Sequence, residues 1–191
     1  MDIYKKMNED TKQNIEGRFI QLIDEKSFKK ITIQDISKAA NMNRGTFYHH
    51  YLDKYDLVEQ MMKKLLEDLE QSLNEIDVHR LLDDIEANTS EVYCETIFDF
   101  IANHRDVFTV FMTKDLPYHF DFHLKQLLIK QFKTQSISIF NTSEIPEDYI
   151  ANFAASALMG LIDEWITEGL EASPEVVTSY YLKIIQSLRA L

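Results

Sequence analysis

Hydrophobic side chains recur every three or four positions along most of the chain, which is the spacing of one face of an α-helix. No stretch of useful length alternates apolar and polar residues as a β-strand does, and the 191 residues include only four Gly and three Pro. The pattern therefore predicts an all-α fold of about nine helices. We expect them at about residues 9–26, 33–40, 44–51, 54–75, 90–101, 106–112, 119–140, 146–168 and 174–191.

Polar residues mark where several of these helices begin and end. Thr32 and Asp53 stand where a side-chain oxygen would accept the unpaired N–H groups of a following helix. Asn41 lies between two short helices and tolerates the left-handed backbone of a tight turn. Gly169 follows the apolar helix that ends near Glu168, and we expect it to close that helix.

The two short helices between Thr32 and Tyr51 form a helix-turn-helix pattern, because a turn of three or four residues joins them. Small or apolar side chains would let the helices pack closely, namely Ile36, Ala39, Ala40 and Met42. Phe47 and Tyr51 are four residues apart and would pin the second helix to the core. The face left outward carries Arg44, Gly45, Tyr48 and His49. A helix presented in this way fits the major groove of B-DNA.

The run TIQDISKAANMNRGTFYHHYLDKYDL, from Thr32 to Leu57, resembles the DNA-binding domain of the TetR family of transcriptional regulators. The segment RGTFYHHY followed by DK carries most of the likeness, whereas Ser27 and Asn41 stand where the family often has Gly. The resemblance implies a helix-turn-helix DNA-binding domain at residues 1–54 and a ligand-binding and dimerisation domain at residues 55–191. It implies DNA contacts from Thr32, Gln34, Arg44, Gly45, Thr46, Tyr48, His49 and Lys54.

Several of these contacts have an alternative interpretation. Arg44 would either fork onto a guanine or hold a phosphate. Tyr48 resembles the family's phosphate-contacting tyrosine, and the alternative is a half-buried packing residue. Lys54 resembles the family's phosphate-anchoring lysine, although by itself it would be an unremarkable surface lysine. Thr32 is expected to cap its helix and to donate to a phosphate, and Gln34 either reads a base or faces solvent.

Charge is distributed unevenly along the chain. Residues 1–54 carry 10 Lys and Arg against 8 Asp and Glu, a net charge of +2. Residues 55–191 carry 10 against 24, a net charge of -14, which leaves the whole chain at -12. Because phosphate binding needs local cations, DNA would have to meet residues 1–54, and the acidic remainder would repel it. The alternative is a solvated acidic surface that aids solubility.

The resemblance is weaker in the rest of the chain. The stretch 97–111, the segment 160–165 and the late SPEVV look like the C-terminal region of TetR-type regulators, some of which activate dihydroxyacetone-kinase operons by binding a partner protein. Such relatives usually hold an effector cavity here, so the resemblance implies a pocket for a small apolar molecule, although an ordinary helical core explains most of the aromatic residues. The expected lining is Leu65, Leu69, Tyr93, Phe98, Ile101, Phe108 and Phe111. A partner protein in place of the small molecule is the alternative.

The helix at about residues 149–166 is apolar on two sides, which predicts burial on two sides. One side would face its own domain and the other a second chain. The last helix adds a further apolar stripe, and two such helices per subunit can form a four-helix interface about a two-fold axis. The expected interface is Phe153, Ala157, Gly160, Leu161, Trp165, Tyr181, Ile184 and Leu188. A monomeric core is the alternative, and the family resemblance favours the dimer.

We find no motif typical of an enzyme active site in the sequence. It lacks a Gly-rich phosphate loop and a Gly-x-Ser-x-Gly motif, and Cys94 is its single cysteine. His119 and His123 are four residues apart, but a solvated helix start is commoner than a metal site at such a pair. We therefore expect no enzyme activity, cofactor or metal site. The N-terminus is unlike a secretory signal and no run of 18 residues is wholly apolar, which favours a cytoplasmic protein without a membrane span.

These expectations describe a homodimeric regulator that binds a palindromic operator in double-stranded DNA, with its two recognition helices roughly 34–36 Å apart. An effector that prefers another separation would lower the affinity for the operator. The long helix that begins after Asp53 links the two domains and is the expected lever. The sequence leaves open whether the protein represses or activates.

Overall fold

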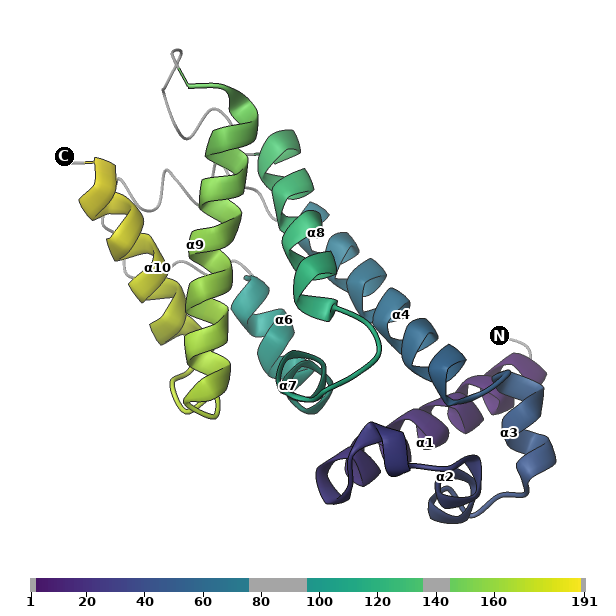
Figure 1. The fold of residues 1–191 in the computed structure, drawn as a ribbon. Coiled ribbons are helices and arrows are strands. Elements are labelled where there is room, and N and C mark those ends of the chain that lie inside the picture. Colours follow the sequence, from purple (N-terminus) through teal and green to yellow (C-terminus); the bar gives the residue numbers. More distant parts are fainter. Residues whose placement is uncertain (1–2, 76–95, 136–144, 190–191) are drawn as a thin grey trace. The chain divides into compact units, whose positions relative to one another are not determined.

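The computed structural model of the protein describes residues 3–75, 96–135 and 145–189 (Figure 1). Over these residues the chain is all-α, as the hydrophobic spacing predicts, with nine α-helices and one short 3-10 helix. The described residues form two compact units. The first unit contains residues 3–65 and 106–120, and the second unit contains the described parts of 66–105 and 121–191.

The first unit is built on three helices that precede a longer one. It holds α1 (Ile3–Glu25), the 3-10 helix η1 (Phe28–Lys30), α2 (Ile33–Ala39), α3 (Arg44–His50), the first half of α4 (Lys54–Asn74) and nearly all of α7 (Arg105–Thr113). α2 packs against both α1 and α3. Ile15 and Phe19 recur at helical spacing on α1 and are fully buried together with Ile36 of α2 and Phe47 of α3. This shared core fixes how α3 is presented.

The second unit holds the rest of α4, α6 (Ile97–Asn103), α8 (Phe120–Gln135, of which Phe120 counts with the first unit), α9 (Glu147–Thr167) and α10 (Pro174–Arg189). α10 packs against α6 and α9. Trp165 of α9 lies in this core: its ring meets Phe98 of α6 edge-on, with 5.7 Å between the centroids. The Trp165 indole N–H donates to the carbonyl of Ala172 at 3.0 Å, so the only polar atom of the side chain is also paired.

The predicted helix ends are confirmed where caps define them. The Thr32 hydroxyl accepts from the backbone N–H of Asp35, and the Asp53 carboxylate accepts from the N–H groups of Tyr55 and Asp56 at 2.8 and 2.9 Å. Asn41 adopts a φ of 54° in the turn between α2 and α3. Gly169, with a φ of 76°, follows α9.

Some boundaries differ from the predictions. α1 begins at Ile3 rather than near residue 9. Tyr4 and Met7 in its first turns are exposed, so they do not belong to the buried stripe from which the helix is predicted. Leu170, next to Gly169, also has a positive φ of 57°, which the sequence did not indicate. The helix expected at 90–101 is described from Ile97, and the part of the expected helix 119–140 beyond Gln135 lies outside the described residues.

The compact units do not follow the chain in simple order, because residues 106–120 belong with the N-terminal ones. The division at residues 54 and 55 concerns which part binds DNA and stays a prediction. Among the described helices, none is long and apolar enough to cross a lipid bilayer.

Candidate nucleic-acid interface

The α2–turn–α3 segment is fixed by side chains on its inner side, which pack in the core of the first unit or bond to α1. Phe47 and Tyr51 are buried as predicted, and the Tyr51 hydroxyl donates to Glu16 of α1 at 2.8 Å. Burial, followed by the charge of Glu16, raises the pKa of the Tyr51 phenol, so this hydroxyl stays a donor. The Asn14 side chain of α1 donates to the Ala40 carbonyl at 2.9 Å, at the end of α2. The segment is therefore tied to α1 at both of its helices.

The outer face of α3 carries a cation and a phenol four residues apart. Arg44 is exposed at the first position of α3, and its Nη2 donates to the Tyr48 hydroxyl at 3.5 Å. Tyr48 is 48% exposed, and its ring packs edge-on against Phe47. The expected packing is thus present, while the contact of Tyr48 with a phosphate stays a prediction. His49 is also exposed on α3, as is Gln34 on α2. The first unit thus brings these four predicted residues to the outer face of its helix-turn-helix.

Gly45 and Thr46 lie close to the cap of α3. The Asn43 side chain accepts from the Thr46 backbone N–H at 2.8 Å and from the Thr46 hydroxyl at 3.2 Å. A Cβ atom added to Gly45 would lie 3.1 Å from the same Asn43 oxygen. Glycine therefore gives the cap room, and the Thr46 hydroxyl is already engaged within the chain.

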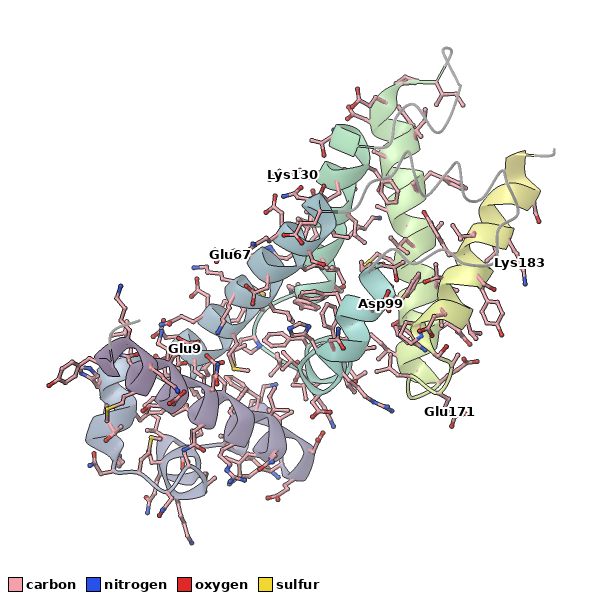
Figure 2. The ribbon with its side chains drawn as sticks, turned by 180° about the vertical axis from the view of Figure 1, so that it is seen from behind. Glu9, Glu67, Asp99, Lys130, Glu171 and Lys183 are labelled. Atoms are coloured by element: carbon pink, nitrogen blue, oxygen red, sulfur yellow. The ribbon has the colours of Figure 1, made fainter. Side chains whose placement is uncertain are left out.

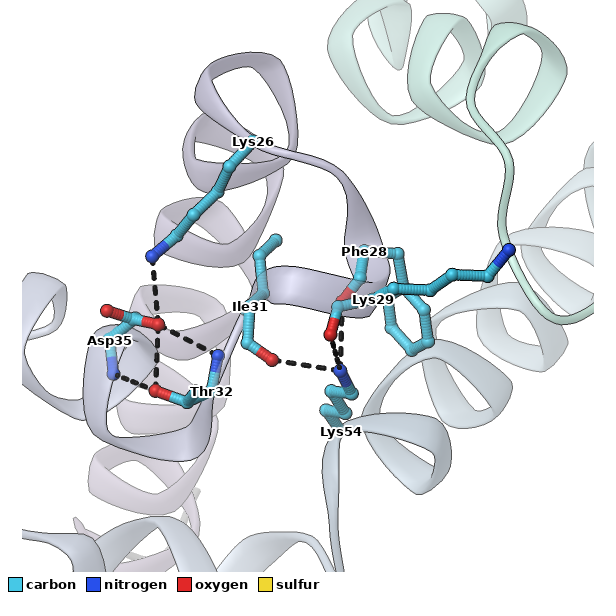
Figure 3. A network of polar contacts seen from close by, with 7 residues as sticks. All are labelled: Lys26, Phe28, Lys29, Ile31, Thr32, Asp35 and Lys54. Atoms are coloured by element: carbon cyan, nitrogen blue, oxygen red, sulfur yellow. Dashed lines mark hydrogen bonds and ion pairs between the residues drawn. The ribbon is translucent and has the colours of Figure 1, made fainter.

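Thr32 is also engaged within the chain (Figure 3). Its hydroxyl donates to the Asp35 carboxylate at 2.7 Å, and its backbone N–H donates to the same oxygen at 2.9 Å. Lys26 contacts that oxygen at 2.8 Å. The bonds from Lys26 and then Thr32 hold the pKa of the Asp35 carboxyl well below its usual range. The capping role of Thr32 is confirmed, while its contact with a phosphate stays a prediction.

The ammonium group of Lys54 contacts backbone carbonyls rather than standing out in solvent. It donates to the carbonyls of Phe28 and Ile31, each at 2.9 Å, and to that of Lys29 at 3.2 Å. Its Nζ lies 4.6 Å from the centroid of the Phe28 ring, within cation–π distance. The ammonium is therefore placed by contacts within the chain, and its contact with a DNA phosphate stays a prediction.

Sequence reasoning missed the residues that support this face. Four side chains position the predicted contacts although none of them was itself predicted to contact DNA, namely Asn14, Lys26, Asp35 and Asn43. Asp35 and Asn43 could have been found from the sequence, because each belongs to a helix cap with a spacing of three residues. Asp35 follows the capping residue Thr32 by three positions, and Asn43 precedes by three positions the Thr46 N–H that it accepts from. Lys26 and Asn14 act across a turn or between helices, and the local pattern carries no sign of them.

The second unit has a different surface, in which exposed carboxylates outnumber cations. Glu67 of α4 and Glu171, which follows α9, are both exposed (Figure 2). Lys130 of α8, also labelled there, forms an ion pair with Glu70 of α4. Such a surface offers little to attract a polyanion.

Part of α9 and α10 leaves large apolar side chains exposed. Phe153 is 59% exposed, Ala157 and Gly160 lie on the exposed side of α9, and Ile184 is exposed on α10. Leu161 and Tyr181 are half-buried, and burial raises the pKa of Tyr181 to about 12. The side chain of Leu188 lies outside the described residues.

Trp165 differs from the other residues expected at the dimer interface. It is only 3% exposed, because the chain's own Phe98 covers it. The two-sided apolar pattern of α9 is therefore real, but it assigns Trp165 to the inner side.

The expected pocket residues fall into both units. Phe108 and Phe111 pack against Phe120 in the first unit, with 5.4 and 5.1 Å between ring centroids, and Leu65 is buried there as well. Leu69, Phe98 and Ile101 are buried in the second unit. Tyr93 lies outside the described residues. Their burial suits a core as well as a cavity lining, so the pocket stays a prediction.

No group of three His, Cys, Asp or Glu side chains able to hold a metal ion occurs within the described parts of the chain. His119 and His123 are both exposed.

Two family models match the chain. The model described as "Bacterial regulatory proteins, tetR family" matches residues 20–61, and a TetR-type model described as "Transcriptional regulator C-terminal region" matches residues 88–187. The chain is 23% identical over 183 residues to the uncharacterised HTH-type transcriptional regulator YxbF of Bacillus subtilis. That alignment covers 96% of this chain but 47% of YxbF, so the chain spans about half the length of this relative.

Solved structures share the fold over nearly the whole chain. A TetR transcriptional regulator from Streptococcus agalactiae has a TM-score of 0.60 at 23% identity, covering 96% of this chain and 97% of its own. The dihydroxyacetone kinase operon activator DhaS has a TM-score of 0.61 at 16% identity, covering 93% of this chain and 95% of its own.

Proposed function

Because this chain belongs to the TetR family of transcriptional regulators, we propose that it binds an operator in double-stranded DNA as a homodimer through the outer face of α3. The observation that carries the proposal is the Arg44–Tyr48 pair, which is exposed on a helix whose inner side and caps are fixed by the chain. The side chains of a recognition helix must be placed precisely, because they form hydrogen bonds with base edges. Contacts on the inner side of the helix provide that placement.

Within this proposal, residues of the outer face take different roles. Arg44 lies at the N-terminal end of α3, the part of a recognition helix that reaches base edges, so it forks onto a guanine or a neighbouring phosphate. The Tyr48 hydroxyl donates to a phosphate, and the exposed side chains of His49 and Gln34 contact bases or phosphates at the edge of the groove. Thr32 and Thr46 contribute mainly by capping, since their hydroxyls already have partners in the chain.

The dimer places two such units on one duplex. The exposed apolar residues of α9 and α10 are suited to face a second copy, because burial of apolar area drives association. Two recognition helices about a two-fold axis would read half-sites one helical turn apart, roughly 34–36 Å, which requires a palindromic operator. As a DNA-binding regulator, the protein would act in the cytoplasm.

We further propose that a small apolar effector modulates operator binding. The second unit is rich in buried aromatic and aliphatic side chains, and α4 belongs to both units, so a ligand that favours one arrangement would change the affinity for DNA. A partner protein acting on the same unit is the alternative. Apolar ligands that raise the melting temperature and shift operator affinity together would support the effector, and their failure alongside a co-purifying partner would support the alternative.

The DNA-binding proposal is tested by selection from a library of random duplexes. The purified chain should enrich sequences with two related half-sites in inverted orientation. Enrichment of a single unrepeated site would contradict the dimeric arrangement, and no enrichment over a protein-free control would contradict DNA binding.

A further inference from the structure

One side chain in the core of the second unit has an unpaired polar atom. Gln131 of α8 is only 8% exposed, and its Nε2 donates to the Asn74 side chain of α4 at 3.0 Å. No donor among the described residues reaches its Oε1, which is fully buried. Thr178, the other buried polar side chain described in this unit, is paired with Thr96. A buried oxygen without a partner destabilises the fold, because it has lost its hydrogen bonds to water.

Gln131 lies on the apolar side of α8. Leu124 and Leu128 share that face of the helix and are buried. The neighbouring Lys130 forms an ion pair with Glu70, so the same turn of α8 is tied to α4 by an exposed contact and by the buried amide. The position of the Gln131 amide is therefore fixed by two contacts between the same helices.

α9 also begins beside this part of α8, because Asp148 in its first turn forms an ion pair with Lys133. The residues that α9 buries in its next turns are small, namely Ala151, Ala154 and Ala155. Their methyl groups carry no hydrogen-bond donor and fill little volume. The described surroundings of the Gln131 oxygen are thus apolar, and a donor has to come from outside them.

Charge limits which groups could approach this oxygen. No Lys, Arg or His side chain is buried in the described parts of the chain, so an anion would find no counter-charge in the interior. A carboxylate would also be repelled by the amide oxygen, since both are acceptors. A neutral hydroxyl or N–H group would donate to the oxygen and remove the cost of its burial. The environment of Gln131 therefore favours a neutral donor on an apolar molecule.

We propose that Gln131 is the polar anchor of the effector, which is a neutral, largely apolar molecule with a hydroxyl or N–H group that donates to Gln131 Oε1. Asn74 orients the amide by accepting from its nitrogen, which leaves the oxygen for the ligand. The inference rests on the proposed effector function of the second unit. It adds the chemical class that the effector must have.

The experiment measures ligand binding by the full chain, with thymol, menthol and decanol as donor probes. Each is compared with its methyl ether, which lacks the O–H, and decanoate is the anionic counterpart of decanol. The test variant is Gln131→Met, which keeps the length of the side chain without its amide. Gln126→Met is the matched control, because Gln126 is an exposed glutamine of the same helix. Isothermal titration calorimetry gives the dissociation constants, and thermal shift checks them.

We expect at least one of the three alcohols to bind the wild type about tenfold more tightly than its methyl ether, the difference that one hydrogen bond makes. Gln131→Met should remove this difference by weakening the alcohol alone, while Gln126→Met should keep it. Decanoate should bind more weakly than decanol. The proposal would be overturned by the absence of any alcohol preference in the wild type, by a preference that survives in Gln131→Met, or by tighter binding of decanoate.

The stability of the ligand-free protein provides a second readout. Because Oε1 is buried without a partner, Gln131→Met should raise the melting temperature by about 2–4 °C, and Gln126→Met should leave it unchanged. Asn74 is exposed, so water replaces the bond that it loses. A lower melting temperature for Gln131→Met would show that the amide stabilises the fold, and this result would overturn the proposal.

Operator affinity separates this proposal from the effector function on which it rests. An alcohol that binds through Gln131 and changes the affinity for the selected operator would support both. An alcohol that binds through Gln131 and leaves operator affinity unchanged would contradict the effector function, while Gln131 would still be established as a ligand anchor.

Discussion

The outer face of α3 and the exposed side of α9 differ in the polarity of the side chains that they expose to solvent. The helix-turn-helix has its caps and inner side chains paired inside the first unit, and what it exposes is polar: Arg44, Tyr48 and His49. The exposed side of α9 presents Phe153 beside small residues, with an apolar ring in solvent. A polar, rigid surface suits a charged polymer, whereas an exposed aromatic ring is stabilised by burial against another apolar surface.

We therefore expect DNA recognition and dimerisation to depend on different surfaces, and substitutions on each surface should affect a different property. Changes on α3 should alter DNA binding and leave the oligomer intact. Changes on the outer side of α9 should alter the oligomer first. Changes on the inner side of α9 should alter folding.

The inner side of α9 should show the largest effect. Trp165→Ala removes a buried ring that packs against Phe98 and leaves a cavity, so the free energy of unfolding should fall by about 3–5 kcal/mol. Chemical denaturation followed by circular dichroism measures it. Tyr149→Ala, at an exposed aromatic residue of the same helix, should cost the single chain little. Similar losses for the two variants would contradict the assignment of Trp165 to the core.

The outer side of α9 should fail by dissociation. Burial of a Phe side chain contributes about 1.5–3 kcal/mol, so Phe153→Glu should raise the dimer dissociation constant by about a hundredfold with the fold retained. Sedimentation equilibrium measures the constant. Phe122→Glu on α8 is the matched control, since Phe122 is exposed to nearly the same extent, 57% against 59%. Dissociation caused by Phe122→Glu instead would move the interface to α8.

The face of α3 should fail by loss of sequence preference. Arg44→Ala should cost about 1–3 kcal/mol on the selected duplex if the guanidinium forks onto a base, with a smaller loss on other DNA. Arg18→Ala, at an exposed arginine of α1, removes the same charge from the same unit and should leave the preference unchanged. Fluorescence anisotropy on both DNAs measures the difference. An Arg44→Ala protein with wild-type affinity and preference would show that α3 is not the reading surface.

Substitution of two glycines should have smaller effects and should also distinguish the proposed interface from the rest of the surface. Gly17 in α1 and Gly160 in α9 are exposed inside helices, and a Cβ atom at either would meet no neighbour within the chain. Each change to Ala should therefore stabilise its helix by about 1 kcal/mol in the monomer. Only Gly160→Ala should also raise the dimer dissociation constant, because the proposed interface needs close helix approach. Equal effects of both changes on dimerisation would place Gly160 outside the interface.

The smallest effect concerns pH. The folded-state pKa of Asp35 is below its ordinary value, so its paired carboxylate contributes stability above the unfolded-state pKa and loses it as pH falls through the folded-state pKa. Melting temperature should therefore decline in acid more steeply for the wild type than for Asp35→Asn, which cannot titrate. Because the ion pair with Lys26 is partly exposed, high salt should reduce the difference. Parallel acid profiles for the two proteins would contradict this role for Asp35.

The fold was largely predictable because its signals are local. Apolar spacing of 3.6 residues marks the helices, and caps such as Thr32 and Asp53 mark their starts. The outer face of α3 followed from a motif in which Phe47 must turn inward. The same pattern does not show which apolar side of α9 the chain itself covers, so it predicts Trp165 at the interface although the chain buries this residue.

The contacts of Lys54 within the chain could not be predicted from the sequence for a different reason. Its partners are carbonyls of residues 28–31, and the backbone carries no side-chain identity that a sequence pattern could reveal. The Lys26–Asp35 pair crosses a turn, so neither residue has the three- or four-residue spacing that marks contacts on one helix. Contacts between residues of different helices were therefore found only in the structure.

The most direct test of this division of labour is the number of chains bound per duplex. Sedimentation velocity of the wild type with a labelled duplex from the random library should give two chains on each duplex. Phe153→Glu should lose most of its affinity for the full site while keeping its weak binding to poly(dI-dC), because the reading surface of α3 is intact. One wild-type chain per duplex, together with full-site binding by Phe153→Glu equal to that of the wild type, would contradict the account.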